Sequence, residues 1–304
     1  MRTVLFGASK AGEYFITQNP QLDIVAIADN DISRQGGVLE GVQIIAPQAL
    51  PNMTFDRLII TSQWVDAITQ QLTQELGIDG DKIQVPTKQQ LKAAEPFRHP
   101  PTLALAHELL CATAHFLQQH GLSACLDSGT LLGVIRDKQL IPWDDDIDMA
   151  VDEREFAQLL EIAPNLYRVL PHYDGICWHI VVLKVDGRDC CINIEFTPTP
   201  ASTYIPFDLS LQMRQSINGY SELVSSAGLF FAPAAHFDTY AETVFLNQTF
   251  AIPQAAEAFL TFMYGNWQTP QQGTRITEYQ NRRASLPPGK AQPVIQKRVL
   301  TKPC

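Results

Sequence analysis

The sequence predicts an α/β protein of two domains. Over the first ninety residues, strand-like apolar runs alternate with helix-like segments, and a run with three prolines in eight residues then interrupts the pattern. A second series of helices and strands follows this run. Strands that alternate with helical segments are typical of a parallel sheet with crossover helices. The chain has 304 residues, which is enough for two separate cores.

Composition and charge narrow the class of protein. The formal net charge is -10, so a protein that coats nucleic acid is excluded and we expect no nucleic-acid partner. Six cysteines are spread without a CxxC pair, which predicts reduced thiols in the cytoplasm. The first residues lead directly into a strand, and no window reaches the ~18 apolar residues of a membrane span. We expect a cytoplasmic protein without an integral membrane segment, and association with the inner face of the membrane stays open.

The first domain is predicted over residues 1–95. Short apolar strands are expected at 3–6, 23–28, 55–61 and 83–85, with helices from the glycine turn to residue 18 and over 65–76. The proline-rich run at 94–101 is not expected to form a helix, so residues 96–101 are predicted to be a linker.

A glycine turn between the first strand and the first helix indicates a Rossmann-like domain. Gly7 and Gly12 frame the turn, and Asp29 ends the next strand, as in a dinucleotide site. The middle glycine, which lets the backbone approach a pyrophosphate, is replaced by Ser9. We therefore favour a turn kept for packing, and Gly7, Ser9, Gly12 and Asp29 remain a candidate nucleotide site at which NAD is not expected.

The second domain is predicted over residues 102–278 as an α+β domain. Its expected helices are 102–120, 130–136, 153–162 and 253–264, and its expected strands are 122–126, 146–151, 167–170, 179–185 and 190–196. From residue 279 to 304 the chain has six basic and no acidic residues, and its prolines predict an irregular basic tail.

The most informative segment is a cluster of four aspartates in five positions, Asp144, Asp145, Asp146 and Asp148. Such a cluster is costly unless a cation is present, so a divalent metal such as Mg²⁺ or Mn²⁺ is expected. On a strand, Asp146 and Asp148 point to the same face. Glu195, the only acid in a later apolar run, is the expected third ligand.

A second group of residues is suited to binding phosphate. Ser128, Gly129 and Thr130 lie between a strand and a helix, where backbone N–H groups can hold an anion, and Arg136 follows one helix later. The order of these elements is that of the nucleotidyltransferase fold. Trp143 could stack on a base or sugar, and Lys184 could pair with phosphate.

An EF-hand calcium loop is the main competing interpretation. Asp144, Asp146, Asp148 and Glu155 fall at its positions 1, 3, 5 and 12. Met149 stands where the loop needs glycine, however, and Pro142 interrupts the incoming helix, so we do not favour it.

The second domain resembles the LicD family, which includes bacterial phosphocholine transferases and is related to the fukutin-related proteins. The resemblance rests on LDSGTLLG at 126–133, IPWDDDID at 141–148, and FAIP, FL and YGNW between 250 and 267, followed by Pro270. It implies a nucleotidyltransferase-like fold that moves a phospho-alcohol group, such as phosphocholine or phosphoribitol, from a CDP-alcohol donor to a glycan.

The resemblance also implies roles for individual residues. Asp146 and Asp148 would hold the metal with Glu195, where family members often have aspartate, and Ser128, Gly129 and Thr130 would face the donor phosphates. The catalytic residues would be Asp144, Asp146 and Asp148, with Asp144 or Asp127 as the base that activates the acceptor hydroxyl. The acceptor would be a cell-surface glycan or a lipid-linked oligosaccharide.

The sequence leaves two other functions open. One is a nucleotide- or nucleotide-sugar-binding protein that acts through the first domain and has an inactive second domain. The other is an NAD-dependent sugar enzyme, which Ser9 argues against.

Overall fold

The computed structural model describes residues 1–92, 95–225, 228–283 and 293–301. Two compact units are present within these ranges. The first contains Met1–Ala93 and Gln271–Gln280, and the second contains Ala94–Pro270, Asn281–Arg283 and the end of the chain from Val294. Each unit is described separately below.

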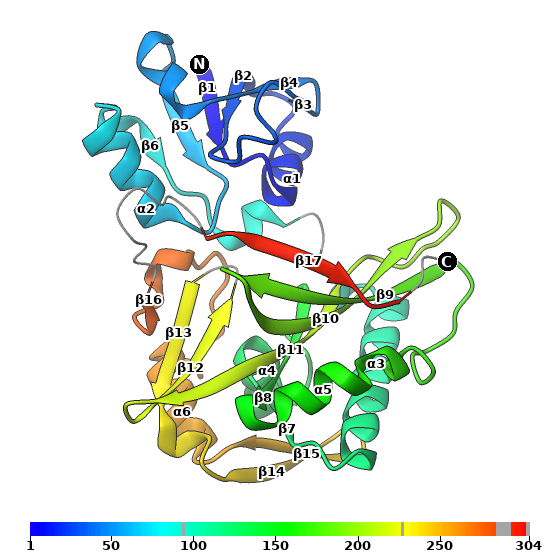
Figure 1. Ribbon diagram of the computed structural model, residues 1–304. Helices are drawn as coiled ribbons and strands as arrows, with labels where there is room; N and C mark the ends of the chain where they lie inside the picture. The colour runs from blue at the N-terminus through cyan, green and yellow to red at the C-terminus, as the bar shows by residue number, and fades with distance from the viewer. Residues whose placement is uncertain (93–94, 226–227, 284–292, 302–304) are drawn as a thin grey trace. The chain divides into compact units, whose positions relative to one another are not determined.

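The first unit is a six-stranded, mainly parallel sheet in the order β3-β4-β2-β1-β5-β6 (Figure 1). Its strands are β1 (Arg2–Phe6), β2 (Asp23–Ala28), β3 (Val38–Leu39), β4 (Val42–Ile45), β5 (Arg57–Ile60) and β6 (Ile83–Gln84). Only β3 pairs antiparallel, with β4. The helices α1 (Lys10–Gln18) and α2 (Val65–Gln70) connect successive strands.

Both faces of this sheet are buried. Val4 and Phe6 belong to one apolar cluster and Leu5 to another, because successive side chains of a strand point to opposite faces. A parallel sheet that is covered on both faces is the α/β arrangement that the sequence predicts.

The second unit contains four helices among its described residues. They are α3 (Pro100–Gln119), α4 (Ser128–Asp137), α5 (Glu153–Leu166) and α6 (Ala256–Tyr264). Helix α3 starts inside the proline run, where the sequence predicted a linker. Prolines at its first two positions explain the difference, since their missing N–H groups would have no partner in the first turn.

The second unit is built on an eleven-stranded mixed sheet. Its main path runs β14-β15-β7-β8-β11-β10-β9-β17. The central strands are β7 (Ala124–Leu126), β8 (Asp146–Asp152), β9 (Ile176–Val185), β10 (Arg188–Pro198) and β11 (Asp208–Ile217). At one end are β14 (Tyr240–Phe245) and β15 (Gln248–Pro253), at the other β17 (Ile295–Val299), while β12 (Tyr220–Ser225), β13 (Gly228–Pro233) and β16 (Arg282–Arg283) branch from β11.

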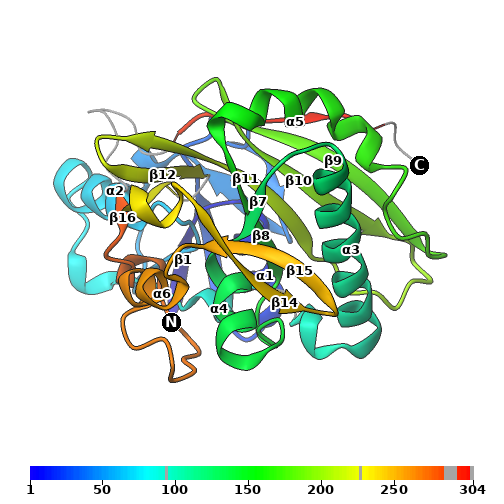
Figure 2. The same cartoon turned by 90° about the horizontal axis from the view of Figure 1, so that it is seen from below.

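The two faces of the central strands differ in chemistry. Ile147, Met149 and Val151 of β8 are almost completely buried in the core that also contains the buried side of α5. Figure 2 shows α3 and α5 beside these strands. On the other face of β8 lie Asp146, Asp148 and Asp152, with the buried Ala150 between the last two. The start of β8 therefore presents acidic side chains on the face opposite Ile147 and Met149.

The structure corrects two expectations about the second unit. The chain after residue 279 is not irregular throughout: β17 pairs antiparallel with β9, from Ile295↔Val185 to Val299↔Val181. Lys290 and Lys302 of the predicted basic tail lie outside the described residues. Residues 167–170 form a turn rather than a strand, because α5 continues to Leu166.

The cysteines also differ from expectation. Cys111, Cys125, Cys190 and Cys191 are free thiols, but Cys177 is disulfide-bonded, so the prediction of six reduced cysteines is wrong at Cys177. In the described part of the chain, no helix combines the length and apolar character needed to cross a bilayer.

Candidate active site

The acidic cluster lies at the entry to β8. Asp144, Asp145 and Asp146 are half-buried, and each offers one carboxylate oxygen within 4.8 Å of those of the other two. Asp144 and Asp145 belong to the loop that follows α4, whereas Asp146 is the first residue of the strand. The trio includes Asp145, to which the sequence assigned no role.

Asp146 continues into a row of polar residues across the sheet. In the parallel pairing of β8 with β11 it lies opposite Asp208. Asp208 lies opposite Glu195 of β10, which in turn lies opposite His179 of β9. Residues that pair in register point to the same face. We call Asp146, Asp208 and Glu195 the acidic row.

Asp208 is a candidate site residue that the sequence interpretation missed. It lies on the strand next to β8, directly opposite Asp146, whereas Glu195 is one strand farther away. The signal was present, because residues 208–214 alternate polar and apolar side chains as a half-buried strand does.

The electrostatic environment of Asp208 shows how closely the acids gather. Burial, together with the negative charges of Asp145 and Glu195, raises the pKa of Asp208 to about 6. A hydrogen bond from Ser210 and the charge of Lys297 act in the opposite direction. A carboxylate that is costly to ionise alone is a suitable ligand for a cation, which removes that cost.

Asp148 lies two residues after Asp146 on β8 and is more deeply buried. Gln212 of β11 donates a hydrogen bond to its carboxylate, and the backbone N–H of Asp148 donates to Thr130 Oγ1 at 2.9 Å. The buried hydroxyl of Thr130 thus holds α4 against β8. The sequence predicted that Thr130 faces the donor phosphates. In the structure its side-chain oxygen instead accepts the N–H of Asp148.

The turn before α4 brings a helix N-terminus next to the acidic cluster. Asp127 caps the helix by accepting the N–H of Ser128, whose φ of 50° lies in the left-handed region. At Gly129 a Cβ atom would collide with Asp144 Oδ2. The absence of a side chain at Gly129 therefore lets the Asp144 carboxylate approach the first turn of α4, where the helix dipole favours negative charge.

Asp127 does not act as the base. Its Oδ2 accepts a hydrogen bond of 2.7 Å from Arg214 Nε, and both side chains are almost completely buried. The Arg214 guanidinium also stacks on Phe237, 4.2 Å from the ring centre. A carboxylate held in a buried ion pair is structural, so of the two base candidates only Asp144 remains.

Two other predicted donor-binding residues lie away from the acidic row. Arg136 bonds to Asp137 and to the carbonyl of Trp267. Lys184 pairs with Asp189 at 3.7 Å, and on β9 it alternates with His179 onto the opposite face. Trp143 is half-buried in the loop before β8, near the cluster in sequence, and its stacking role stays a prediction.

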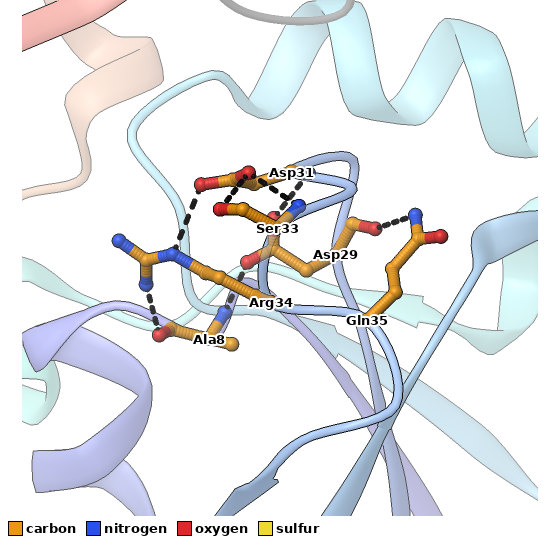
Figure 3. A network of polar contacts seen from close by, with 6 residues as sticks. All are labelled: Ala8, Asp29, Asp31, Ser33, Arg34 and Gln35. Atoms are coloured by element: carbon orange, nitrogen blue, oxygen red, sulfur yellow. Dashed lines mark hydrogen bonds and ion pairs between the residues drawn. The ribbon is translucent and has the colours of Figure 1, made fainter.

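In the first unit, side chains of the protein bind the backbone groups of the glycine turn. The buried carboxylate of Asp29 accepts the N–H of Ala8 at 2.6 Å and that of Asp31 at 2.8 Å. Arg34 donates to the carbonyl of Ala8 from the other side, and Figure 3 shows the two side chains converging on this residue. In a dinucleotide site the corresponding acid would be available to a ribose.

The two glycines of this turn serve packing. Gly7 has a φ of 119°, and a Cβ on Gly12 would collide with the Gly7 carbonyl. Ser9 precedes α1 without making a side-chain cap. These contacts fit the interpretation of a turn kept for close approach of helix and strand.

The acidic cluster has the donor set that a hard divalent cation requires. All its ligand atoms are carboxylate oxygens, the trio is half-buried, and Asp208 is costly to ionise without a counter-ion. Asp144, Asp145 and Asp146 are the residues whose carboxylate oxygens converge and could hold such an ion, with Asp148 beside them on β8 and Asp208 opposite Asp146 on β11.

The strand, Gly-Thr turn, helix and acidic strand define the second unit as a nucleotidyltransferase-like domain. Residues 121–207 match the family model described as LicD/FKTN/FKRP, nucleotidyltransferase domain. The second unit is thus similar over these residues to the LicD-type nucleotidyltransferase domain, as the sequence motifs indicated. Residues 1–84 match a second model, described as C2185-like, N-terminal.

Solved structures resemble the chain only loosely. A UDP-D-quinovosamine 4-dehydrogenase from Vibrio fischeri is 16% identical over 28% of this chain and 76% of its own, with a TM-score of 0.24. A UDP-N-acetylglucosamine 3-dehydrogenase from Acidithiobacillus ferrooxidans is 11% identical over 85% of both chains, with a TM-score of 0.22. These likenesses carry no argument about this chain. The search of curated proteins found no match.

Proposed function

We propose that the protein is a metal-dependent phosphotransferase that moves a phospho-alcohol group from a CDP-alcohol to a hydroxyl of a cell-surface glycan. The observation that supports this most is that the residues matching the LicD model, 121–207, contain the carboxylate cluster of Asp144, Asp145 and Asp146 at the entry to β8. The alcohol would be choline- or ribitol-like, as in the family that the motifs resemble.

Of the ligands that the sequence indicated, this proposal keeps Asp146 and replaces Asp148 and Glu195. Asp146 and Asp208 would hold the cation from neighbouring strands, and Asp145 would complete the set from the loop. Asp148 supports the site through its bonds to Gln212 and α4. When bound, the cation neutralises the charge that develops on the donor pyrophosphate.

The protein's own groups account for the remaining chemistry. The acceptor oxygen attacks the phosphorus next to the alcohol, that phosphorus–oxygen bond to CMP breaks, and CMP leaves with the bond electrons. Asp144, beside Gly129, takes the proton of the acceptor hydroxyl. At the start of α4, the backbone N–H of Gly129 faces the donor phosphates, whereas that of Ser128 is already donated to Asp127.

The first unit supports no second function in this proposal. Both oxygens of Asp29 already accept backbone N–H groups, so a ribose would have to displace them. We therefore do not favour the NAD-dependent alternative.

The experiment is a thermal stability assay of the full chain with CDP-choline, CDP-ribitol, CDP-glycerol and NAD, each with and without Mg²⁺ or Mn²⁺. Binding to the native state raises the unfolding midpoint. We expect a metal-dependent shift with one CDP-alcohol that Asp146→Asn abolishes. The matched control is Asp238→Asn, the same change at an exposed position of the second unit, which should keep the shift. A shift with NAD alone, indifferent to metal, would contradict the proposal.

A further inference from the structure

The last strand of the chain brings a basic side chain to the acidic row. In β17, Lys297 lies opposite Leu183 of β9. Leu183 is four residues from His179 on the same strand, so the two share a face. Lys297 therefore belongs to the polar face that carries Asp146, Asp208 and Glu195.

Contacts agree with this placement. Lys297 Nζ lies 3.4 Å from Glu195 Oε2, and more than half of its side chain is exposed. Its positive charge also opposes the effects of Asp145 and Glu195 on Asp208. The lysine thus acts on the centre of the acidic row and is not confined to a single surface pair.

The neighbouring residue behaves differently. Arg298 is next in the same strand and points to the opposite face, where it lies 4.0 Å from Asp189. Two adjacent basic residues, both exposed and both on the edge strand, therefore differ in whether they face the acidic row. This difference provides a matched control.

We propose that Lys297 binds a phosphate oxygen of the nucleotide donor and that β17 thereby completes the donor site. The inference rests on the proposed function. A donor pyrophosphate that approaches three carboxylates needs positive charge besides the cation, and an exposed lysine can exchange a weak carboxylate contact for a phosphate. Glu195, which is not needed as a metal ligand, holds the lysine in position until the donor arrives.

The test measures binding of CDP to the full chain by calorimetry, with and without Mg²⁺, in the wild type and in the variants Lys297→Met, Lys297→Arg and Arg298→Met. We expect Lys297→Met to weaken Mg²⁺-dependent CDP binding by about tenfold. Lys297→Arg should restore most of the affinity, Arg298→Met should stay within about twofold of the wild type, and cytidine, which lacks phosphate, should not distinguish the variants.

The outcomes separate this inference from the function on which it rests. If the wild type binds CDP with Mg²⁺ and Lys297→Met binds it equally well, Lys297 has no part in donor binding while the proposed function stands. If Arg298→Met loses as much affinity as Lys297→Met, the effect is one of general charge, and the inference is wrong. If the wild type shows no metal-dependent CDP binding, both proposals fail. Equal unfolding midpoints of the two methionine variants would show that the effect is not a loss of structure.

Discussion

Arg214 Nε lies 2.7 Å from Asp127 Oδ2 at a position where both side chains are almost completely buried. The pair connects the start of α4 to the middle of β11, two elements that carry the candidate site. An ion pair of this kind fixes geometry, but it also makes each partner depend on the other.

Removing one partner of this pair should therefore strongly lower the stability of the protein. We expect Arg214→Met to lower the free energy of unfolding by about 3–5 kcal/mol, because Asp127 is left as an unpaired buried charge. Urea unfolding followed by circular dichroism would measure this. The control is Arg154→Met, which removes an exposed pair with Asp152 and should change the free energy of unfolding far less. If both variants cost the same, the Asp127–Arg214 pair is not buried as described.

Asp208 should make the stability of the metal-free protein depend on pH. The pKa of Asp208 is about 6 in the folded protein against 3.8 for the free side chain, because burial and its acidic neighbours disfavour the charged form. The unfolded chain thus binds fewer protons between these values, and this group reduces stability as pH rises from about 4 to about 6. With a chelator at pH 8, Asp208→Asn should raise the unfolding midpoint, and at pH 4 it should change it little.

Asp208→Asn should be less stable than the wild type once metal is present. We expect Mn²⁺ to stabilise the wild type at pH 8 and to stabilise Asp208→Asn much less, because a ligand is lost. Glu195→Gln is the comparison, since Glu195 lies one strand farther from Asp146. A greater loss of Mn²⁺ binding in Glu195→Gln than in Asp208→Asn would contradict the assignment of ligands.

Substitution by alanine should have different effects at the two glycines of α4, on metal binding at Gly129 and on stability at Gly133. At Gly129 the added Cβ would meet the Asp144 carboxylate, which can turn away, so Gly129→Ala should cost less than about 1 kcal/mol of stability. It should nevertheless weaken Mn²⁺ binding by about tenfold or more, since moving the Asp144 carboxylate, which lies beside the ligands Asp145 and Asp146, has an effect of that size. Titration of Mn²⁺ by electron paramagnetic resonance would measure it.

Gly133→Ala is the counterpart. Its Cβ would meet the backbone carbonyl of Gln139 and the Ile141 side chain, which cannot move aside. We expect a loss of stability of about 1–3 kcal/mol, with Mn²⁺ affinity retained in the folded fraction. The reverse pattern, with Gly129→Ala unstable and Gly133→Ala unable to bind Mn²⁺, would refute the described packing around α4.

In the first unit, Asp29→Ala should release the glycine turn. Two backbone N–H groups lose their acceptor, at a cost of about 1–3 kcal/mol. Hydrogen exchange of peptides from β1 and β2 should become faster, while Asp31→Ala, which removes a partly exposed carboxylate from the adjacent loop, should change it less. Binding of NAD by the wild-type protein, in which Asp29 still holds the turn, would contradict the structural role given to this residue.

Local patterns were enough to predict much of the fold. The expected strand 23–28 coincides with β2. The alternation of Ile147, Met149 and Val151 located β8, because a strand that is buried on one face has apolar residues at every second position. The α/β class is confirmed, as is the LicD-type domain, since both depend on contiguous segments.

What the sequence could not predict concerns relations between distant segments. Glu195 was expected as the third acid and stays a prediction, but β11 lies between β10 and β8 and places Asp208 opposite Asp146. Arg136 and Lys184 were judged by distance along the chain, whereas Trp267 and Asp189 decide where their charges lie. No residue spacing reports strand order, so the acidic row could only be found from the sheet.

The pairing of β17 with β9 also sets an order of events during synthesis. Val299 adds to Val181, so β9 is an open edge strand for as long as the last residues of the chain have not been made. An unpaired edge of this kind is a site for association with other chains. A chain whose synthesis stops before Ile295 would thus have a sheet that can still pair with a strand of another chain, and this edge is closed only once Ile295–Val299 has been made.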